Sequence, residues 1–126
     1  MQKETQCLSQ AVYHEARGES LEGMKAVAQV VFNRTTNRKF PKTICEVVYQ
    51  PFQFQWVGKT KTPRDDEFRK IEIISRLMLE HHYDGHKIYD GKAKSALFFS
   101  VNGFSFKGLK LVEKIGNHRF YVFAKS

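Results

Sequence analysis

Cross-linking residues and long apolar runs are both scarce in this chain. Its 126 residues include two cysteines, three prolines and one tryptophan. Two thiols do not indicate a disulfide framework, so we expect Cys7 and Cys45 to be reduced structural residues. No apolar stretch approaches the length of a membrane span, and the N-terminus shows no apolar core of a secretory signal. The sequence therefore predicts synthesis in the cytoplasm without a signal peptide, and no transmembrane segment.

Acidic residues are also in the minority. Only 13 residues are Asp or Glu, against 21 Lys and Arg, which gives a formal net charge of +8 at pH 7 and a pI near 9.6. A cationic surface predicts an anionic partner, and nucleic acid, lipid headgroups and bacterial envelope polymers all qualify. With 41% hydrophobic and 13% aromatic residues, a chain of this length builds one compact core. We expect a single domain over residues 1–126, as a monomer.

The apolar pattern changes along the chain from helical to strand-like. Apolar spacing and end signals predict helices at about 4–16, 20–34, 44–49 and 62–84, the last of them capped by Thr62. Alternating residues predict strands at 96–101, 104–106, 109–115 and 119–123, with hairpin turns at 102–103 and 116–118. We therefore predict an α+β fold, mainly helical in its first two thirds, with a small antiparallel sheet formed by the last third.

One acidic residue interrupts the apolar face of the first predicted helix. Glu15 stands at i+7 on a stripe whose earlier members are Leu8, Ala11 and Val12. A carboxylate moved out of water has a raised pKa and keeps its proton near neutrality, as general-acid catalysis requires. The alternative is an ordinary helix-end residue paired with Lys or Arg. Spacing alone favours the ion pair, because catalytic acids are rarer.

Sequence motifs around Glu15 reverse that preference. The chain contains E-A-R-G-E at 15–19, E-G-M-K-A-V-A-Q-V-V-F-N-R at 22–34, F-P-K-T-I-C-E-V-V at 40–48, Q-F-Q-W at 53–56, A-L-F-F at 96–99 and I-G-N-H-R-F-Y at 115–121. In this order the motifs resemble the SleB/CwlJ-type cell-wall hydrolases, the family of the spore cortex-lytic enzymes. The chain departs from the family at 100–104, where members often carry a His followed by a Pro and a Trp.

The resemblance implies a lysozyme-like α+β domain that cleaves the glycan strands of bacterial peptidoglycan. The first Glu of the family motif corresponds to Glu15, which implies one essential residue that acts as general acid and then as base. The reaction implied is lytic transglycosylation, which leaves a 1,6-anhydro end, or the related muramidase-type hydrolysis. No metal and no organic cofactor are implied. A solitary basic domain without a secretion signal further suggests a phage endolysin that acts at the cell wall or periplasm, attracted by the anionic envelope.

Two other charged residues of the motif are candidates for secondary roles. On a continued helix, Glu19 would share one side with Glu15, where it would take part in proton transfer and raise the pKa of Glu15. A turn at Gly18 would point Glu19 away, and it would then bind Arg17, Arg34 or a backbone amide. Arg17 is either an orienting residue of the site or a surface charge that compensates the Glu pair.

Six residues are candidates for substrate binding. Aromatic rings hold the apolar faces of sugar rings, and polar side chains form hydrogen bonds with N-acetyl and hydroxyl groups. The candidates are Tyr13, Asn33, Phe54, Trp56, His118 and Tyr121. For each of them the structural alternative is core packing, or a hydrogen bond to a buried backbone group or within a turn.

Two other function classes remain as alternatives. Basic runs interleaved with aromatic residues occur in nucleic-acid-binding domains, but here Lys and Arg are spread over every segment without a recognised motif, so we expect no nucleic-acid partner. An N-acetylmuramoyl-L-alanine amidase would keep the substrate and change the bond, but such enzymes usually use zinc or a Cys nucleophile. His82 and His86 have helical i, i+4 spacing without a third ligand at a recognised spacing. The sequence therefore predicts no metal site.

Overall fold

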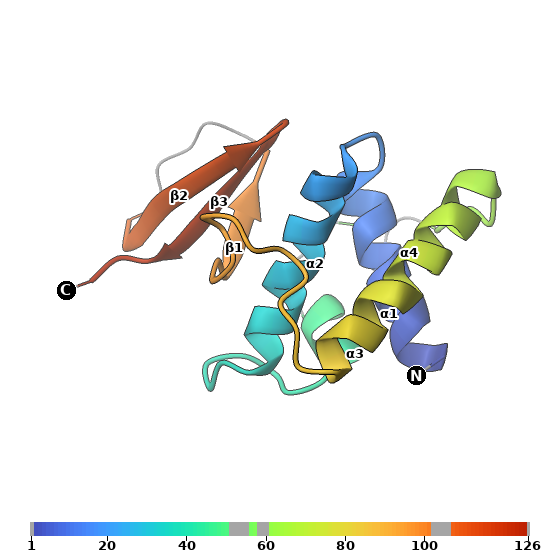
Figure 1. Ribbon diagram of the computed structural model, residues 1–126, viewed down its shortest axis with the longest axis horizontal. Helices are drawn as coiled ribbons and strands as arrows, with labels where there is room; N and C mark the ends of the chain where they lie inside the picture. Colours follow the sequence, from blue (N-terminus) through green and yellow to red (C-terminus); the bar gives the residue numbers. More distant parts are fainter. Residues whose placement is uncertain (1, 51–55, 58–60, 102–106, 126) are drawn as a thin grey trace.

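The computed structural model describes residues 2–50, 56–57, 61–101 and 107–125, and it shows a group of helices beside a small sheet (Figure 1). The helices are α1 (Gln2–Ala16), α2 (Leu21–Thr35), α3 (Ile44–Val48) and α4 (Asp66–Tyr83). The strands are β1 (Phe98–Ser100), β2 (Leu109–Ile115) and β3 (His118–Phe123). The prediction of an α+β fold with helices first and strands last is confirmed.

Helix α1 is the centre of the helical part. It contacts α2, α3 and α4. Its buried apolar residues include Leu8, Ala11, Val12, Tyr13 and Ala16. The stripe predicted from spacing is therefore the core face, and each large apolar side chain buried there contributes about 1.5–3 kcal/mol. The helix end that carries Glu15 is fixed by this packing.

The helix boundaries follow local capping, with one correction. Ser20 caps α2 as predicted, since its hydroxyl accepts a hydrogen bond from the Gly23 N–H at 3.1 Å. The prediction that Thr62 caps the last long helix is wrong. Asp65 caps α4 instead, and its Oδ1 accepts a hydrogen bond from the Phe68 N–H at 2.8 Å. Asp is the better N-cap of the two residue types, and the Thr62 hydroxyl contacts α1 instead.

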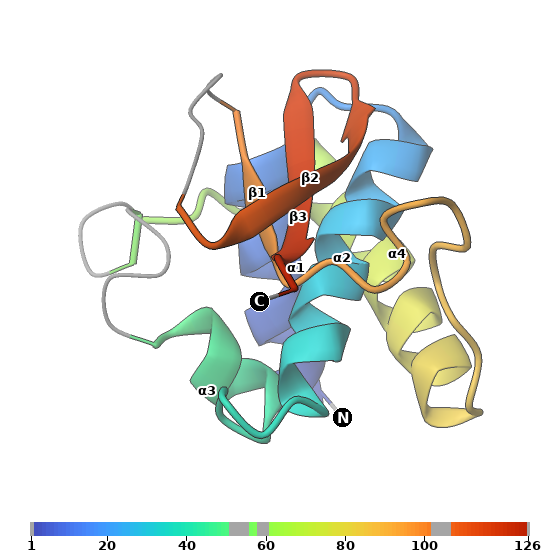
Figure 2. The same ribbon diagram turned by 90° about the vertical axis from the view of Figure 1, so that its left-hand side faces the viewer.

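Strand β3 is the middle strand of the sheet, with β1 and β2 antiparallel on either side. Gly116, at φ +56°, and Asn117 form the turn between β2 and β3. The sequence predicted His118 in this turn, but His118 is the first residue of β3. The predicted hairpin at 102–106 lies outside the described residues. Strand β1 contacts α2, and the sheet lies in front of the helices in the view of Figure 2.

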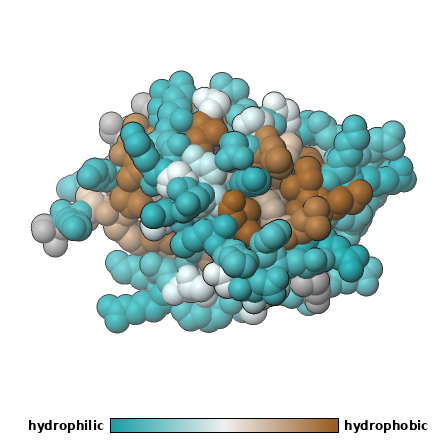
Figure 3. Space-filling model, in the orientation of Figure 1, coloured by the Kyte–Doolittle hydropathy of each residue, from teal (hydrophilic) through white to brown (hydrophobic). Residues whose placement is uncertain are grey.

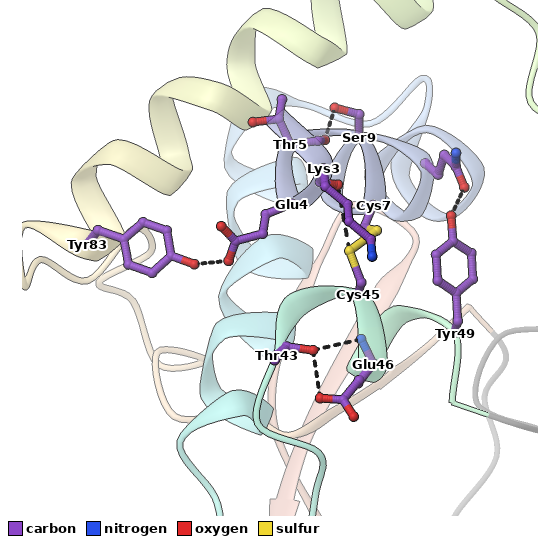
Figure 4. Close-up of a disulfide and its surroundings, with 11 residues drawn as sticks. Lys3, Glu4, Thr5, Cys7, Ser9, Thr43, Cys45, Glu46, Tyr49 and Tyr83 are labelled. Atoms are coloured by element: carbon purple, nitrogen blue, oxygen red, sulfur yellow. Dashed lines mark hydrogen bonds between the residues drawn. A yellow bond between two sulfur atoms is a disulfide. The ribbon is translucent and has the colours of Figure 1, made fainter. Parts of the chain in front are cut away.

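A disulfide joins Cys7 of α1 to Cys45 of α3 (Figure 4). The expectation of two reduced cysteines is therefore wrong. The two residues are 38 positions apart in the sequence, but the packing of α3 on α1 brings their Cα atoms to 5.3 Å, which is within the range for a disulfide. A cysteine count cannot reveal this proximity because the tertiary fold creates it. Tyr49, directly after α3, adds a hydrogen bond to Gln10 of α1.

The surface combines a polar exterior with a local apolar groove. In the view of Figure 3, apolar side chains gather over the region of α2 and α4. A groove of about 390 Å³ there is lined by Leu21, Lys25, Ile74, Leu77, Met78, His81, Lys87 and Ile88. Among the helices of the described residues, none has the length and apolar character needed to cross a bilayer.

Candidate active site

The last turn of α1 carries the acidic residue that the sequence singled out. Glu15 lies there with its side chain half-buried. Burial raises the pKa of the Glu15 carboxyl, while the neighbouring Trp56 side chain lowers it by a smaller amount. A carboxyl with a raised pKa keeps its proton to higher pH, which is the condition for a general acid. The position matches the prediction from spacing, and the catalytic role stays a prediction.

Trp56 reaches the site from the segment between α3 and α4. Its indole ring stacks on the imidazole of His14, with ring centroids 4.4 Å apart and planes 18° apart. Tyr49 meets the indole edge-on at 6.3 Å between centroids. The structure thus brings Trp56 beside the end of α1, whereas Phe54, the other aromatic candidate of this segment, lies outside the described residues.

Glu19 binds the turn between β2 and β3. Its Oε1 accepts a hydrogen bond from the Asn117 backbone N–H at 3.2 Å, and its Oε2 accepts one from the Asn117 side-chain amide at 3.2 Å. His118 Nδ1 lies 3.7 Å from Oε1. The backbone hydrogen bond is the main reason that the pKa of Glu19 lies below its ordinary value. Gly116 suits this turn because a Cβ there would overlap Glu19 Oε1.

The contact with Asn117 answers one question that the sequence left open. Glu19 binds a backbone amide, as one of the alternatives had it, and its part in proton transfer stays a prediction. The two motif carboxyls thus have different surroundings, since burial raises the pKa of Glu15 and the Glu19 carboxylate accepts hydrogen bonds from the β2–β3 turn.

Arg17 and Tyr13 connect the end of α1 to the start of α4. Arg17 Nη1 donates a hydrogen bond to the Tyr13 hydroxyl at 2.5 Å, and that hydroxyl donates to Asp65 Oδ2 at 3.1 Å. Arg17 also lies over the Tyr13 ring, 4.6 Å from its centroid, and 3.7 Å from Glu67 Oε1. Tyr13 is only 1% exposed. These contacts fix the helix end beside Glu15, and a direct contact of either residue with substrate stays a prediction.

Asn33 and Tyr121, two further candidates for substrate binding, are buried and already bonded. The Asn33 amide donates hydrogen bonds to the carbonyls of Lys94 and Ala96 at 3.0 and 2.8 Å. The Tyr121 hydroxyl lies 3.2 Å from Ser100 Oγ, where either group can donate. Both positions fit the structural alternative, in which the side chain holds the segment around β1.

His118 is buried in the sheet at 1% exposure. Its ring contacts those of Phe99 and Phe120, with centroids 5.5 and 6.1 Å away. Neither ring nitrogen has a hydrogen-bond partner among the described residues. The position fits a residue that stabilises the hairpin better than one that touches a sugar.

The structure adds residues that sequence reasoning missed. His14 and Thr62 form a hydrogen-bonded pair beside Trp56, with 2.7 Å between His14 Nε2 and Thr62 Oγ1. Asn117 holds Glu19. Asn117 lies inside the G-N-H motif and could have been noted there. The pairing of His14 with Thr62 carries no local signal, because 48 residues separate them.

The histidines near the end of α4 contact aromatic rings or each other, and only His82 is half-buried. His82 stacks on Phe32 with centroids 4.2 Å apart and planes 5° apart. His81 and His86 contact each other with centroids 6.2 Å apart. In the part of the chain that the structure describes, no three His, Cys, Asp or Glu side chains are grouped so that they could hold a metal ion.

Two solved structures share this fold over nearly the whole chain. The catalytic domain of the Bacillus cereus SleB protein matches with a TM-score of 0.70 and 26% identity, over 97% of this chain and 91% of that one. The catalytic domain of the germination-specific lytic transglycosylase SleB from Bacillus anthracis matches with a TM-score of 0.68 and 27% identity, over 97% and 96% of the two chains. The lysozyme-like α+β class that the motifs implied is confirmed.

The sequence pattern of the cell wall hydrolase family matches residues 18–121, and the chain belongs to this family. The spore cortex-lytic enzyme of Oceanobacillus iheyensis is 45% identical over 57 residues, which are 45% of this chain and 21% of that protein. The Bacillus subtilis enzyme of the same name is 45% identical over 51 residues, 40% of this chain and 17% of that protein. The matched segments thus span about a fifth of these curated relatives.

The family match begins at Gly18, three residues after Glu15. The assignment of Glu15 therefore depends on its place in the E-A-R-G-E motif and on its half-buried position at the end of α1.

Proposed function

We propose that this protein cleaves the glycan strands of peptidoglycan, with Glu15 as both proton donor and proton acceptor. The observation that carries the proposal is the half-buried carboxyl at the end of α1, whose pKa is raised by burial. Membership of the cell wall hydrolase family supports the substrate class. The Bacillus anthracis relative is described as a lytic transglycosylase, which supports the reaction type.

In the proposed reaction, protonated Glu15 gives its proton to the glycosidic oxygen while the bond from that oxygen to C1 of N-acetylmuramic acid breaks. The 6-hydroxyl of the same sugar attacks C1, and the new C1–O6 bond closes a 1,6-anhydro ring. Glu15, now a carboxylate, takes the proton of that hydroxyl and returns to its starting state. No water is consumed. Attack by water in place of the hydroxyl would give muramidase-type hydrolysis with a new reducing end.

The internal attack needs no second carboxylate, and this agrees with the contacts of Glu19. Both Glu19 oxygens accept hydrogen bonds from Asn117. A second catalytic carboxylate would have to face the sugar across from Glu15, within about 5–10 Å of it. We therefore assign Glu19 to the anchoring of the β2–β3 turn, and Glu15 alone to proton transfer.

For the biological role, we propose lysis of a host cell from the outer side of its cytoplasmic membrane, in the manner of a phage endolysin. The net charge of +8 favours attraction to an anionic envelope. The disulfide between Cys7 and Cys45 suits an oxidising compartment such as the periplasm. Cells that express the protein should lyse when their cytoplasmic membrane is permeabilised. Cells that express E15Q should not.

Digestion of purified murein with analysis of the products by mass tests the bond that is cleaved. Anhydro-muramoyl ends support the proposal as stated, while new reducing ends would move it to muramidase-type hydrolysis. Peptides with a free amino group on L-alanine, together with intact glycan strands, would support the amidase alternative and overturn the proposal. A protein that leaves murein unchanged but binds DNA would favour the nucleic-acid-binding alternative.

A further inference from the structure

A histidine lies directly beside the proposed acid and contacts both other segments of the site. His14 precedes Glu15 on α1, and its imidazole ring is nearly parallel to the Trp56 indole at 4.4 Å. On its other side, His14 Nε2 lies 2.7 Å from Thr62 Oγ1, in the segment that leads to α4. His14 therefore links α1, the Trp56 segment and the approach to α4 at one point.

The hydrogen bond with Thr62 restricts rotation of the imidazole ring. A side chain that is bonded at one ring atom and packed on one face has little rotamer freedom left, which is how supporting residues hold a functional group in place. Tyr13 adds an edge-on contact to the His14 ring, with centroids 5.4 Å apart. The indole of Trp56 thus stacks on a side chain whose rotation is restricted.

The protonation state of His14 suits this use. Burial is the larger cause that lowers its pKa, and the charge of Arg17 is the smaller one. At neutral pH the ring is therefore a neutral imidazole, which stacks on an indole without a buried charge and can accept or donate one hydrogen bond with Thr62.

We propose that His14 is a positioning residue for the reaction: held by Thr62, it carries the Trp56 indole against Glu15 and so sets the environment of the acid. The proposal rests on the function proposed above for Glu15. It also fixes how Trp56 can meet substrate, because one face of the indole is covered by His14 and a sugar ring can stack only on the opposite face.

The test uses the intrinsic fluorescence of Trp56, which is the sole tryptophan of the chain. In H14A we expect the emission maximum to shift to longer wavelength and acrylamide quenching to increase, because the indole loses its support and meets more water. We expect kcat on soluble glycan strands to fall by about 10-fold to 100-fold with a smaller change in KM, since a displacement of about 1 Å at a reacting group can cost about 100-fold.

Two further variants, H14F and T62V, distinguish loss of the ring stack from a general loss of folding. H14F keeps an aromatic face for the indole and should restore the emission and most of kcat. T62V keeps the imidazole and removes its hydrogen bond, so its kcat should lie between those of wild type and H14A. The matched control is H82A, which removes another histidine that is stacked on an aromatic ring, here Phe32. H82A should change neither the Trp56 emission nor kcat.

Two outcomes would overturn the proposal. Unchanged Trp56 emission and quenching in folded H14A would show that the stack does not hold the indole. A changed emission with kcat within about threefold of wild type would show that the stack does not serve Glu15, since a displaced acid should lower kcat by about 10-fold or more. Repeating the fluorescence measurements in the E15Q background tests the stack even if Glu15 is not the acid, so the two proposals can fail separately.

Discussion

At the scale of single residues, Glu15 and Glu19 show how one short motif gives two carboxyls opposite properties. Glu15 loses hydration at the half-buried end of α1, and its pKa rises. Glu19 accepts hydrogen bonds from Asn117, and its pKa falls. The first arrangement favours a protonated side chain and the second an ionised one. The difference arises from what each side chain contacts, since the two residues are chemically identical.

The raised pKa of Glu15 predicts a stability cost at neutral pH. A group whose pKa is higher in the folded protein than in the unfolded chain stabilises the fold only while it is protonated, and this contribution is lost as pH rises through the folded-state pKa. E15Q resembles the protonated form at every pH. We therefore expect E15Q to have a larger free energy of unfolding, and hence a higher Tm, than wild type at pH 7.

Calorimetry at two pH values checks this prediction. Near pH 4 the wild-type carboxyl is largely protonated, and the two Tm values should coincide. An E15Q protein that is less stable than wild type at pH 7 would show that ionised Glu15 is held by a favourable partner, as in the ion-pair alternative.

Part of this site could be read from the sequence at the residue scale. The burial of Glu15 followed from its stripe with Leu8, Ala11 and Val12, because helical spacing is a local property. Its neighbours could not be foreseen. Trp56 meets His14 only because the chain folds back between α3 and α4, and no local pattern encodes that contact.

At the scale of elements, the α1–α2 corner and the β2–β3 turn are joined through Glu19. The carboxylate bonds two groups of Asn117, and Gly116 leaves room for it. This contact connects the helical part to the sheet close to the end of α1. The turn therefore depends on a residue that precedes it by 98 positions.

We predict that E19Q lowers the stability at neutral pH by about 1–2 kcal/mol, because it removes charge-assisted hydrogen bonds. Since the folded-state pKa of Glu19 is lowered, its contribution is present above the unfolded pKa and is lost as pH falls through the folded one. The difference between E19Q and wild type in urea unfolding should therefore shrink in acid.

Activity distinguishes this role from catalysis. At a temperature where E19Q is fully folded, murein cleavage should stay within about tenfold of wild type, whereas loss of a general acid costs about 100-fold or more. A folded E19Q protein with activity as low as that of E15Q would show that Glu19 takes part in catalysis.

The disulfide acts between two other elements, α1 and α3. It closes a loop with a sequence separation of 38 residues. Restricting the unfolded chain in this way contributes about 2–4 kcal/mol. We predict that a C7S/C45S double variant loses that amount in denaturant unfolding, and that reductant lowers the stability of wild type equally but leaves the variant unchanged. An equal response of both proteins to reductant would show that the bridge is absent in solution.

At the scale of the whole molecule, local patterns predicted the elements well and their contacts poorly. The helical first part, the three strands of the last third that lie within the described residues and the lysozyme-like class agreed with the structure. The start of α4 and the bonded state of the cysteines did not. The helix begins at a local cap, Asp65, that is stronger than the predicted one, whereas the disulfide depends on a contact between distant segments. A single domain over residues 1–126 and a monomeric state stay predictions.

The net charge of +8 gives a prediction for the molecule as a whole. Binding of inactive E15Q to purified sacculi, measured by pelleting, should weaken at least about threefold between about 0.05 and 0.3 M salt, because the Debye length shortens over this range. H82A in the same background carries the same charge and should behave alike. Binding that does not change with salt would argue against electrostatic attraction to the envelope.

The most direct measurement is the rate at which E15Q releases soluble products from murein, compared with wild type under conditions where both are folded. If Glu15 supplies and recovers the proton, the rate should fall by about 100-fold to 10,000-fold, while the fold and the binding to sacculi persist. A folded E15Q protein that releases the same products within about tenfold of the wild-type rate would contradict the role of Glu15.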